Sequence, residues 1–557
     1  MIRRPPRSTL DRSSAASDVY KRQAETYHLS QHRRGTRRHI YAVQRNHCIC
    51  LRRHGEIKDK ENYRMKLVGL GLTMHDSSIA AYKDGKFLYR KAERQFNSKH
   101  AFGGMKWAQN VLKEWDMQDA VIAQAGWLKG RDVNQVVNNQ NILDHHYAHT
   151  MSCTDKHEKH YVADALSLGP ADNSQEQEAY SGMIIDDKIT RVEKYAIPSV
   201  LRPAVWSEFF EHEIELRNFY KKIQSQDINL VEWAKQMYAT EMTDEHWVNF
   251  VKTIDLPGKI MGLQAYGKPN LNKIEQWFNT QYPRVTAFHS TNSEIPSIDT
   301  ISTLHKFCEQ SIINDAPQGS FGYSGGVAQN VVINRALIDA GYKPDVYPWA
   351  YDGGCSIGAL NYLLDQHDIP RYNDWVQDDI APETTPNLST IKRVAELIAQ
   401  NKIVGWYQGH GEVGPRALGQ RSILFNPTHA DGKDIVNKIK KREWWRPFGA
   451  SVKEDRANEF FDIPVSRHML INSNVKYSGI PAVTHVDGTC RHQTVPQENE
   501  VYYGLLDEVE KLIDVPIVGN TSLNIKGKPI VATIEDAKKI KLDAICIGNE
   551  LYENLHS

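Results

Sequence analysis

His410-Gly-Glu-Val-Gly-Pro-Arg-Ala-Leu-Gly-Gln-Arg-Ser-Ile-Leu424 is followed closely by Asn437-Lys-Ile-Lys-Lys-Arg-Glu-Trp-Trp-Arg-Pro-Phe448, and our expectations for the fold start from these two stretches. Glycines Gly414 and Gly419 predict a turn in the first stretch, and we expect the second to be a short helical run. Glycine lets backbone N–H groups approach an anion, and guanidinium groups bind phosphate or carboxylate oxygens through two hydrogen bonds. The cations that this pattern would bring together are Arg416, Arg421, Lys440, Arg442 and Arg446.

A solvated basic surface with two structural turns is the alternative for these cations. Against it, aromatic and proline side chains alternate with the charges in the second stretch: Trp444, Trp445, Pro447 and Phe448. Cations beside an apolar wall are typical of a pocket. We therefore predict a binding site for a small molecule that carries phosphate.

Length and composition indicate a globular protein with more than one domain. The chain has 557 residues, of which 40% are hydrophobic and 24% are charged. It contains no apolar run of about 18 residues and no secretory leader, so we expect no membrane contact. Its seven cysteines are scattered without a CxxC pair, which indicates a reducing cytoplasm, or the host cytoplasm if the chain is encoded by a phage.

The net charge of zero hides a split between residues 1–64 and the remainder. The first 64 residues carry 16 Lys+Arg against 6 Asp+Glu, which leaves 52 against 62 for the rest. An acidic body argues against non-specific nucleic-acid binding. The opening residues resemble translated sequencing-adaptor read-through, so we expect 1–64 to be a non-native or disordered leader and Met65 to be the natural start. A basic arm that binds nucleic acid is the alternative.

The amino-acid sequence after Met65 predicts strands and a tight turn. Lys66–Leu72 and Ser78–Tyr82 have the composition of buried strands, and Lys83-Asp84-Gly85-Lys86 predicts a hairpin into Phe87–Ala92. The polar loop between the first two strands contains His75 and Asp76. Actin-like ATPase folds place their first phosphate loop at such a position, although His-Asp is also common in ordinary turns.

A histidine pair predicts a metal site. Asp144-His145-His146-Tyr147-Ala148-His149 should open a helix, with His145 and His149 on one face. Two imidazoles need a carboxylate to complete a two-histidine, one-carboxylate site. Asp352, in Asp352-Gly353-Gly354, stands at a strand end before a glycine turn and is our candidate. Chance spacing of unrelated histidines is the alternative.

Three further segments are candidates for nucleotide or phosphate contacts. Gly258–Gly267 is punctuated by glycine and contains Lys259 and Gly262. Gly319–Tyr323, then Gly325-Gly326 and Asn330, then the helix predicted over 331–340, form a strand–diglycine–helix pattern that presents free N–H groups. Ser522 and Asn524, after the strand predicted over 515–518, could hold a phosphate or urea-like group or form a polar turn.

Nine segments in this order resemble the O-carbamoyltransferase family of nodulation-factor and aminoglycoside-tailoring enzymes, a resemblance that runs from Met65 almost to the C-terminus. The segments are GLTMHDSS, DHHYAH, GKIMGLQAYG, SGGVAQN, DGGCSIGA, GHGEVGPRALGQRSIL, NKIKKREWWRPF, THVDG and GNTSLNIKGKPIV. The resemblance implies an α/β protein with an N-terminal actin-like ATPase domain and a C-terminal domain resembling threonylcarbamoyl-AMP synthase. We expect these at 65–373 and 388–557, with a linker over 374–387.

The resemblance also implies a reaction. The second domain would condense carbamoyl phosphate with ATP into carbamoyl adenylate and release pyrophosphate, and the first would pass the carbamoyl group to a hydroxyl. Arg416, Lys440 and Arg442 would be catalytic in the first step, and His75 and Asp76 in the second, with His75 as general base. A divalent ion, expected to be Fe²⁺, would bind His145, His149 and Asp352, while Mg²⁺ accompanies ATP. Nucleotide and carbamoyl phosphate would be held by Lys259, Gly262, Gly325, Gly326, Asn330, Arg421, Arg446, Arg491, Ser522 and Asn524.

One departure from the family and one open choice remain. Relatives carry an Asp-Gly turn in the strand after the histidine pair, where this chain has Leu166–Asp172, so Asp172 would have to substitute for that carboxylate. The acceptor we favour is 5-hydroxymethylcytosine in DNA or its nucleotide, as in phage DNA modification, with Thr73–Ser78 and the aromatic segment 200–255 around the base. A sugar or antibiotic hydroxyl is the alternative acceptor. A homodimer is compatible with the family, and a non-catalytic nucleotide-binding regulator or an actin-like sugar kinase is the alternative of another class.

Overall fold

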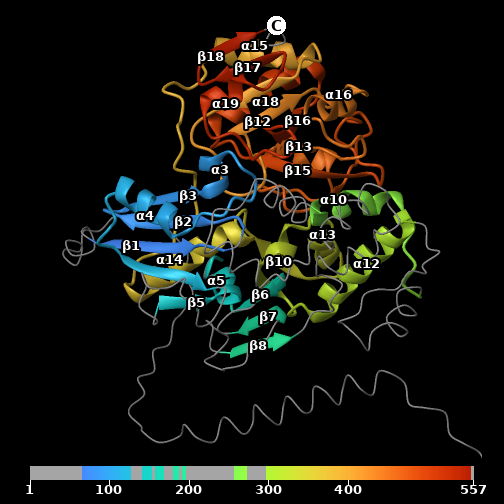
Figure 1. The fold of residues 1–557 in the computed structure, drawn as a ribbon. Coiled ribbons are helices and arrows are strands. Elements are labelled where there is room, and N and C mark those ends of the chain that lie inside the picture. The colour runs from blue at the N-terminus through green and yellow to red at the C-terminus, as the bar shows by residue number, and fades with distance from the viewer. Residues whose placement is uncertain are drawn as a thin grey trace, which may run out of the picture. The chain divides into compact units, whose positions relative to one another are not determined.

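The computed structural model describes residues 65–73, 75–126, 141–153, 157–167, 180–186, 191–195, 256–272 and 297–553 (Figure 1). All of them belong to the compact unit Lys58–Ser557. The expected leader over 1–64 and the aromatic segment 200–255 lie outside the described residues. Among the helices that are described, none is long and apolar enough to cross a membrane.

Two five-stranded sheets in the N-terminal half repeat one topology. The first has the order β3-β2-β1-β4-β5, and the second β8-β7-β6-β9-β10. In each, the first three strands are antiparallel, and the last two run parallel to the first. This duplication is the actin-like ATPase topology that the sequence predicted. The strands are β1 (Lys66–Gly71), β2 (Ser78–Lys83), β3 (Lys86–Lys91), β4 (Val121–Gly126), β5 (Ile142–Asp144), β6 (Lys159–Ser167), β7 (Tyr180–Asp186), β8 (Arg191–Tyr195), β9 (Ser320–Ser324) and β10 (Lys343–Val346).

Strand β1 is buried on both faces because a helix covers each side of its sheet. Val68 and Leu70 pack with helix α4 (Met105–Glu114), while Leu67 packs with helix α14 (Cys355–Gln366). A strand with two covered faces is apolar throughout rather than alternating, as this strand is. The Asp84-Gly85 turn between β2 and β3 has φ values of 52° and 77°, which confirms the predicted hairpin.

Helix α14 is held very close to its neighbours by glycines. A Cβ at Gly69 in β1 would overlap the Ser356 carbonyl oxygen, and one at Gly358 in α14 would overlap the Ala148 carbonyl oxygen. Ala148 belongs to helix α5 (His145–Met151), so α14 contacts β1 and α5 at backbone distance. Asp144 caps α5 by accepting hydrogen bonds from the N–H groups of His146 (2.9 Å) and Tyr147 (3.1 Å).

The C-terminal half forms an eight-stranded mixed sheet in the order β14-β15-β13-β16-β12-β11-β17-β18. Helices α15 (Leu388–Ala399) and α18 (Glu500–Ile513) pack on one face. Helices α16 (Gly432–Ile439), α17 (Ala457–Phe460) and α19 (Ile534–Lys538) pack on the other. The strands are β11 (Val404–Tyr407), β12 (Arg421–Phe425), β13 (Gly449–Lys453), β14 (Ser473–Asn474), β15 (Thr489–Val495), β16 (Ile517–Ser522), β17 (Ala544–Ile547) and β18 (Glu550–Glu553).

Most of the remaining described elements connect strands within one or the other sheet of the N-terminal half. They are α3 (Ala92–Phe96), α10 (Leu256–Leu263), η4 (Gln264–Tyr266), α12 (Ser297–Asp315), η5 (Gly326–Gln329), α13 (Val331–Asp339), η6 (Asp352–Gly354) and η7 (Glu454–Arg456).

Two local predictions are wrong. Helix α16 ends at Ile439, so Lys440, Arg442 and Arg446 lie on the turn after the helix rather than in a helical run; Lys441 adopts a left-handed φ of 54° there. The strand predicted over 515–518 instead starts at Ile517 and extends to Ser522, because Gly519 to Ser522 pair with β12.

The glycine at the α14–α5 contact gives a stability prediction. Gly358→Ala should lower the free energy of unfolding by about 2–3 kcal/mol, because a backbone oxygen occupies the space of the new methyl group. Gly504→Ala in helix α18 is the matched control. It meets nothing within 4 Å and should stabilise its helix by about 0.5–1 kcal/mol. Urea unfolding followed by circular dichroism measures both; equal midpoints for Gly358→Ala and wild type would contradict the close contact.

Candidate active site

Two histidines and two carboxylates converge beside helix α14. His149 Nε2 lies 3.1 Å from Asp164 Oδ2 and 3.4 Å from Asp352 Oδ1. His145 Nε2 lies 3.3 Å and 3.6 Å from the same two oxygens. All four side chains are buried, and the structure therefore brings together the three predicted metal ligands.

The spacing and chemistry of these four donors fit a divalent metal ion. Ligands that bind one ion at about 2.0–2.2 Å stand about 3–3.5 Å apart, close to the distances observed here. Burial alone would lower the pKa of the two imidazoles, but Cys355, Asp352 and Asp164 raise the pKa of His145 and His149 well above the usual value. The negative groups around both rings thus favour positive charge, which a bound metal ion would supply in place of protons.

Asp164 is the residue that the sequence reasoning missed. It lies in β6, eight positions before Asp172, which we expected to replace the family's Asp-Gly carboxylate. Asp172 itself lies outside the described residues. Burial would raise the pKa of Asp164, but hydrogen bonds to His145 and His149 hold it well below its usual value. A lone carboxylate inside the apolar run of β6 was the signal that could have identified it.

His75 and Asp76 form a hydrogen-bonded pair next to these donors, in which Asp76 is buried and the His75 side chain is partly exposed. Asp76 Oδ2 lies 2.9 Å from His75 Nδ1 and 2.8 Å from His100 Nδ1, while His75 Nε2 lies 3.6 Å from Asp352 Oδ2. Burial would lower the pKa of His75, but Asp352 and Asp76 raise it, which makes its ring a stronger proton acceptor. Asp76 has a φ of 60°, so the loop holds this carboxylate in a strained backbone conformation.

A buried lysine completes the surroundings of Asp76. Lys91 Nζ lies 2.6 Å from Asp76 Oδ1 and 2.9 Å from Glu93 Oε1. Asp76, Glu93 and His100 are close enough to suggest a second metal site, but Lys91 already places a cation between the two carboxylates. Lys91 and His100 were not identified from sequence, because nothing in their spacing links them to Asp76.

The diglycine segment passes directly by Asp164. Gly325 has a φ of 94°, and a Cβ there would overlap the Ala163 carbonyl oxygen. A Cβ at Gly326 would lie 3.1 Å from Asp164 Oδ1. The side chain of Asn330 caps helix α13 by accepting hydrogen bonds from the N–H groups of Val332 and Ile333, and its nucleotide contact stays a prediction.

Five cations gather on the C-terminal sheet: Arg416, Lys440, Arg442, Arg446 and Arg491. Burial and the neighbouring Arg491, Arg446 and Arg442 together lower the pKa of Arg416. Burial and Arg446 lower the pKa of Arg491 to about 10. Like charges held this close repel one another, so binding a polyanion would stabilise the group.

Lys440 connects the cations to the predicted carbamoyl and phosphate contacts. Its side chain is 2% exposed and donates to the Ser522 carbonyl and to Asn524 Oδ1 at 2.7 Å. Ser522 Oγ donates to Asn524 Oδ1 at 2.8 Å, so both polar side chains point to one place, as predicted. Burial, followed by Arg442, Arg446 and Lys99, lowers the pKa of Lys440 well below the usual value.

Arg421 does not join the cation cluster, contrary to our prediction. Its guanidinium is 0% exposed, lies 3.6 Å from the centre of the Tyr407 ring, and is 3.0 Å from Asp379 Oδ2. It also donates to the carbonyl oxygens of Gln408 at 2.7 Å and Ile380 at 3.2 Å. These contacts attach the predicted linker over 374–387 to the C-terminal sheet.

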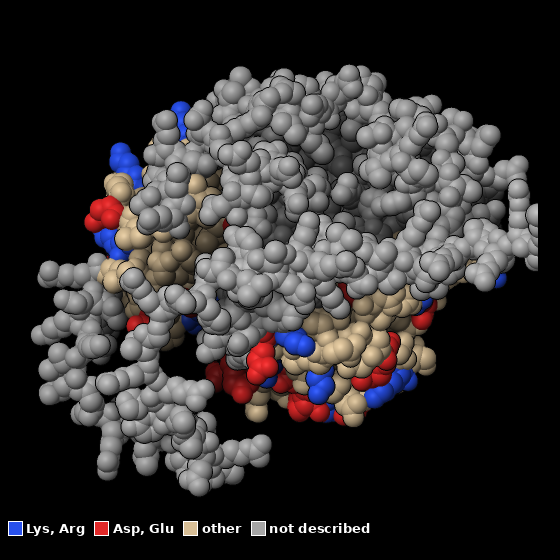
Figure 2. All heavy atoms as spheres, turned by 90° about the horizontal axis from the view of Figure 1, so that it is seen from below, with Lys and Arg blue, Asp and Glu red and all other residues tan. Residues whose placement is uncertain are grey.

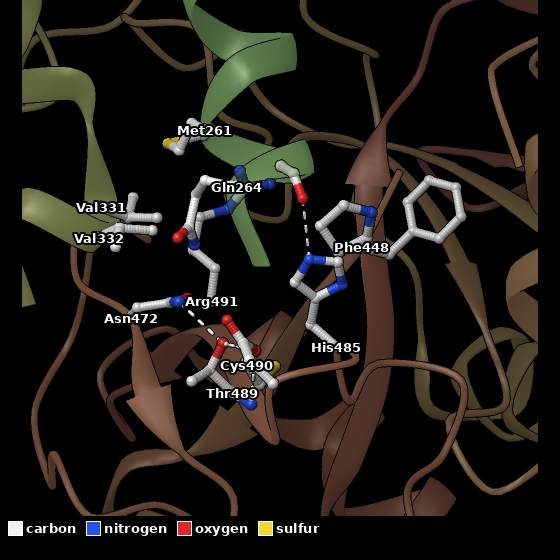
Figure 3. A pocket seen from close by; sticks show the side chains of 13 residues that line it. Met261, Gln264, Val331, Val332, Phe448, Asn472, His485, Thr489, Cys490 and Arg491 are labelled. Carbon is white, nitrogen blue, oxygen red and sulfur yellow. Dashed lines mark hydrogen bonds between the residues drawn. The ribbon is translucent and has the colours of Figure 1, made fainter. Parts of the chain in front are cut away.

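A small pocket lies between the glycine-punctuated segment and the C-terminal sheet (Figure 3). Met261, Gly262 and Gln264 line one side, and Phe448, Thr489 and Arg491 line the other. His485 Nε2 lies 3.1 Å from the Gly262 carbonyl oxygen. The THVDG segment therefore contacts the segment that contains Gly262, one of the residues predicted to hold nucleotide or carbamoyl phosphate. Lys259 lies in α10, but its side chain is outside the described part of the chain.

The two predicted sites meet at Arg416. Its Nη2 donates to the Gln329 carbonyl oxygen at 3.0 Å, and Gln329 ends the diglycine turn. The cation cluster therefore has a direct contact with the segment that passes Asp164. Residues far apart in sequence, from 145 to 491, are thus connected through one chain of contacts.

Parts of the chain are similar to known proteins. Residues 395–554 match the family model described as the carbamoyltransferase C-terminus. The chain is 36% identical over 263 residues to nodulation protein NolNO of Sinorhizobium fredii, covering 41% of this chain and 39% of that protein. It is 30% identical over 339 residues to nodulation protein U of Azorhizobium caulinodans, covering 51% and 60%. Residues 395–554 are thus similar to the C-terminal part of carbamoyltransferases, and the chain's matches span less than two thirds of the length of these relatives.

Solved structures give weaker likenesses. Component A of (R)-2-hydroxyglutaryl-CoA dehydratase from Acidaminococcus fermentans is 14% identical, with a TM-score of 0.32, and covers 54% of this chain and 97% of that one. The activator of 2-hydroxyisocaproyl-CoA dehydratase from Clostridium difficile is 12% identical, with a TM-score of 0.28, and covers 55% and 96%. The strand order, rather than these scores, carries the fold assignment.

Arg421→Met tests whether Arg421 is structural. Removing the guanidinium leaves Asp379 buried without its cation, so the free energy of unfolding should fall by roughly 3–5 kcal/mol. Arg446→Met is the control, because Arg446 is only partly buried and lies 3.7 Å from Glu443; its effect on unfolding should be below about 1 kcal/mol. If Arg421→Met unfolded like the wild type but no longer bound carbamoyl phosphate, Arg421 would be a binding residue rather than a structural one.

Asp164→Asn tests the correction in the metal site. The neutral amide should weaken binding of a divalent ion at least about tenfold, while Asp172→Asn should leave it unchanged. Metal affinity is measured by calorimetry after chelator treatment. The reverse pattern, with Asp172→Asn deficient and Asp164→Asn normal, would show that the family's carboxylate has moved to position 172.

Proposed function

We propose that the chain is an ATP-dependent O-carbamoyltransferase. The observation that supports this most directly is that the five-cation cluster lies within the residues that match the carbamoyltransferase C-terminus, 395–554. The proposal goes further than this similarity, because it concerns the reaction of this chain and its acceptor.

The cation cluster suits the first step, formation of carbamoyl adenylate. Direct attack on a carbamoyl carbon is slow, because the nitrogen donates electron density into the carbonyl. Carbamate oxygen would attack the α-phosphorus of ATP and displace pyrophosphate. Atom balance requires that carbamoyl phosphate also loses its phosphate, with one water consumed. Arg416, Lys440 and Arg442 would offset the repulsion between the two polyanions.

The polar pair beside Lys440 suits the carbamoyl group. Asn524 Nδ2 donates to the Lys528 carbonyl oxygen at 2.7 Å, which fixes the amide so that Oδ1 faces Lys440 and Ser522. A carbamoyl group has an N–H₂ donor and a carbonyl acceptor. Asn524 Oδ1 would accept from its nitrogen, and the Lys440 ammonium would donate to its oxygen.

His75 suits the second step, transfer to a hydroxyl. Asp76 fixes the ring through Nδ1, so Nε2 faces the side of Asp352 and can accept the proton of the acceptor hydroxyl. The hydroxyl oxygen would attack the carbamoyl carbon, and AMP would leave. A divalent ion on His145, His149, Asp164 and Asp352 would supply positive charge next to the adenylate phosphate. The ion we propose is Fe²⁺, with Mg²⁺ bound to ATP.

The acceptor we propose is the hydroxyl of 5-hydroxymethylcytosine, in DNA or as a nucleotide. It would approach the loop around His75, whose side chain is partly exposed next to the metal donors. Among the described residues that are visible in Figure 2, acidic and basic side chains are interspersed. The excess of acidic residues after position 64 favours the nucleotide over DNA. A sugar or antibiotic hydroxyl is the alternative acceptor.

Pyrophosphate release that requires carbamoyl phosphate tests the proposed reaction. Arg416→Ala should abolish this release because it removes a cation from the cluster, whereas His145→Ala should keep release and block transfer. Lys438→Ala, an exposed cation at the end of α16, is the matched control and should keep both. Pyrophosphate release without dependence on carbamoyl phosphate would identify a simple ATP pyrophosphohydrolase. No release in wild type would favour a kinase if ADP forms, and a non-catalytic regulator if it does not.

Mass spectrometry of nucleosides identifies the acceptor in the same reactions. A mass gain of one carbamoyl group on 5-hydroxymethylcytosine, seen with the nucleotide or with modified DNA, is the expected result. If pyrophosphate is released without this mass gain, the proposed reaction stands but the proposed acceptor is wrong, and a sugar or antibiotic hydroxyl becomes the candidate acceptor.

A further inference from the structure

A buried thiol lies against the same imidazoles as the carboxylates. Cys355 is the first residue of helix α14 and is 0% exposed. Its Sγ lies 3.7 Å from His149 Nε2 and 3.9 Å from His145 Nδ1. The partial positive charge at a helix N-terminus favours an anionic sulfur at this position.

The thiol and the carboxylates approach different nitrogens of His145. Both carboxylates face Nε2 of His145, whereas the sulfur faces Nδ1 of the same ring. His149 uses its Nε2 toward all three groups. The site therefore contains two overlapping donor sets: an oxygen-rich set of His145 Nε2, His149 Nε2, Asp164 and Asp352, and a sulfur-containing set of His145 Nδ1, His149 Nε2 and Cys355.

We propose that Cys355, His145 and His149 form a second metal-binding mode that takes thiophilic ions and excludes the oxygen-rich mode. This inference deepens the proposed function, because it assumes that the four-donor group binds a divalent ion. A tetrahedral ion bound at about 2.0–2.3 Å separates nitrogen and sulfur ligands by about 3.5 Å, a few tenths of an ångström less than observed. Since both sets need His149 Nε2, one ion prevents the other from binding.

The chemistry of the donors decides which ion each mode takes. Thiolate with two imidazoles selects soft or borderline ions such as Zn²⁺ and Cu⁺, while carboxylates favour harder ions such as Mn²⁺. Binding through sulfur would release the thiol proton. The thiophilic mode would also withdraw His149 from the carboxylates, so such an ion would inhibit the proposed transfer step.

Cd²⁺ and Mn²⁺ are the probes that distinguish the two modes. The full-length chain carries Cys48→Ser and Cys50→Ser as background substitutions, because two cysteines one residue apart could bind Cd²⁺ themselves. Cd²⁺ should bind and give a thiolate-to-metal charge-transfer band in the ultraviolet difference spectrum. It should also displace bound Mn²⁺, which is detected as free Mn²⁺ by electron paramagnetic resonance.

Cys355→Ser should remove the band and weaken Cd²⁺ binding at least about tenfold while leaving Mn²⁺ affinity nearly unchanged. Cys153→Ser is the matched control, since Cys153 is also buried but contacts the His149 carbonyl oxygen at 4.0 Å rather than a ring nitrogen; it should keep the band. Cd²⁺ binding that survives Cys355→Ser, or that occurs without a band, would overturn the second mode while the Mn²⁺ site remains. Failure of both ions to bind would overturn the proposed metal site as well.

Discussion

The close contact of helix α14 with β1 and α5 is the constraint on which the candidate site depends. Glycines at positions 69 and 358 let backbone meet backbone, and the start of α14 is thereby placed beside the imidazoles of α5. Asp352 and Cys355 flank that start, so their distances to His145 and His149 follow from the packing of the helix. A side chain at Gly358 would separate α14 from α5, which bring Cys355 and His145, 210 positions apart in sequence, into one cluster.

Unlike the residues of the buried core, the members of the cation cluster do not stabilise one another. Its like charges repel, and the fold holds them together through backbone geometry: the turn after α16, strand β15 and the loop before β12 present them to one place. Neighbouring aromatic groups contribute as well, since the Arg442 guanidinium lies 5.0 Å from the centre of the Phe448 ring. A group assembled against its own repulsion is suited to partners that carry several negative charges.

Sequence reasoning predicted those parts of the structure that depend on local pattern. The Asp-Gly hairpin, the capped helix with its histidine pair and the strand–diglycine–helix segment are encoded by neighbouring residues, and the structure contains them. Asp164 was missed because its neighbours His145 and His149 lie on helix α5, which meets strand β6 only in the folded chain. Arg421 was misplaced for the same reason, since sequence cannot show that its neighbours in space are Tyr407 and Asp379. Asn330 lies at the predicted start of a helix, where its side-chain amide caps helix α13.

The strand order of the C-terminal sheet has a consequence for self-association. Among the described strands, the outermost are β14, with two residues, and β18, whose sequence Glu-Leu-Tyr-Glu has exposed carboxylates at both ends. An edge of two residues offers little backbone for a foreign strand to pair with, and repeated negative charge repels a second copy of the same edge. Strand β15, which carries Arg491, lies inside these borders. The sheet is thereby protected against aggregation through its edges.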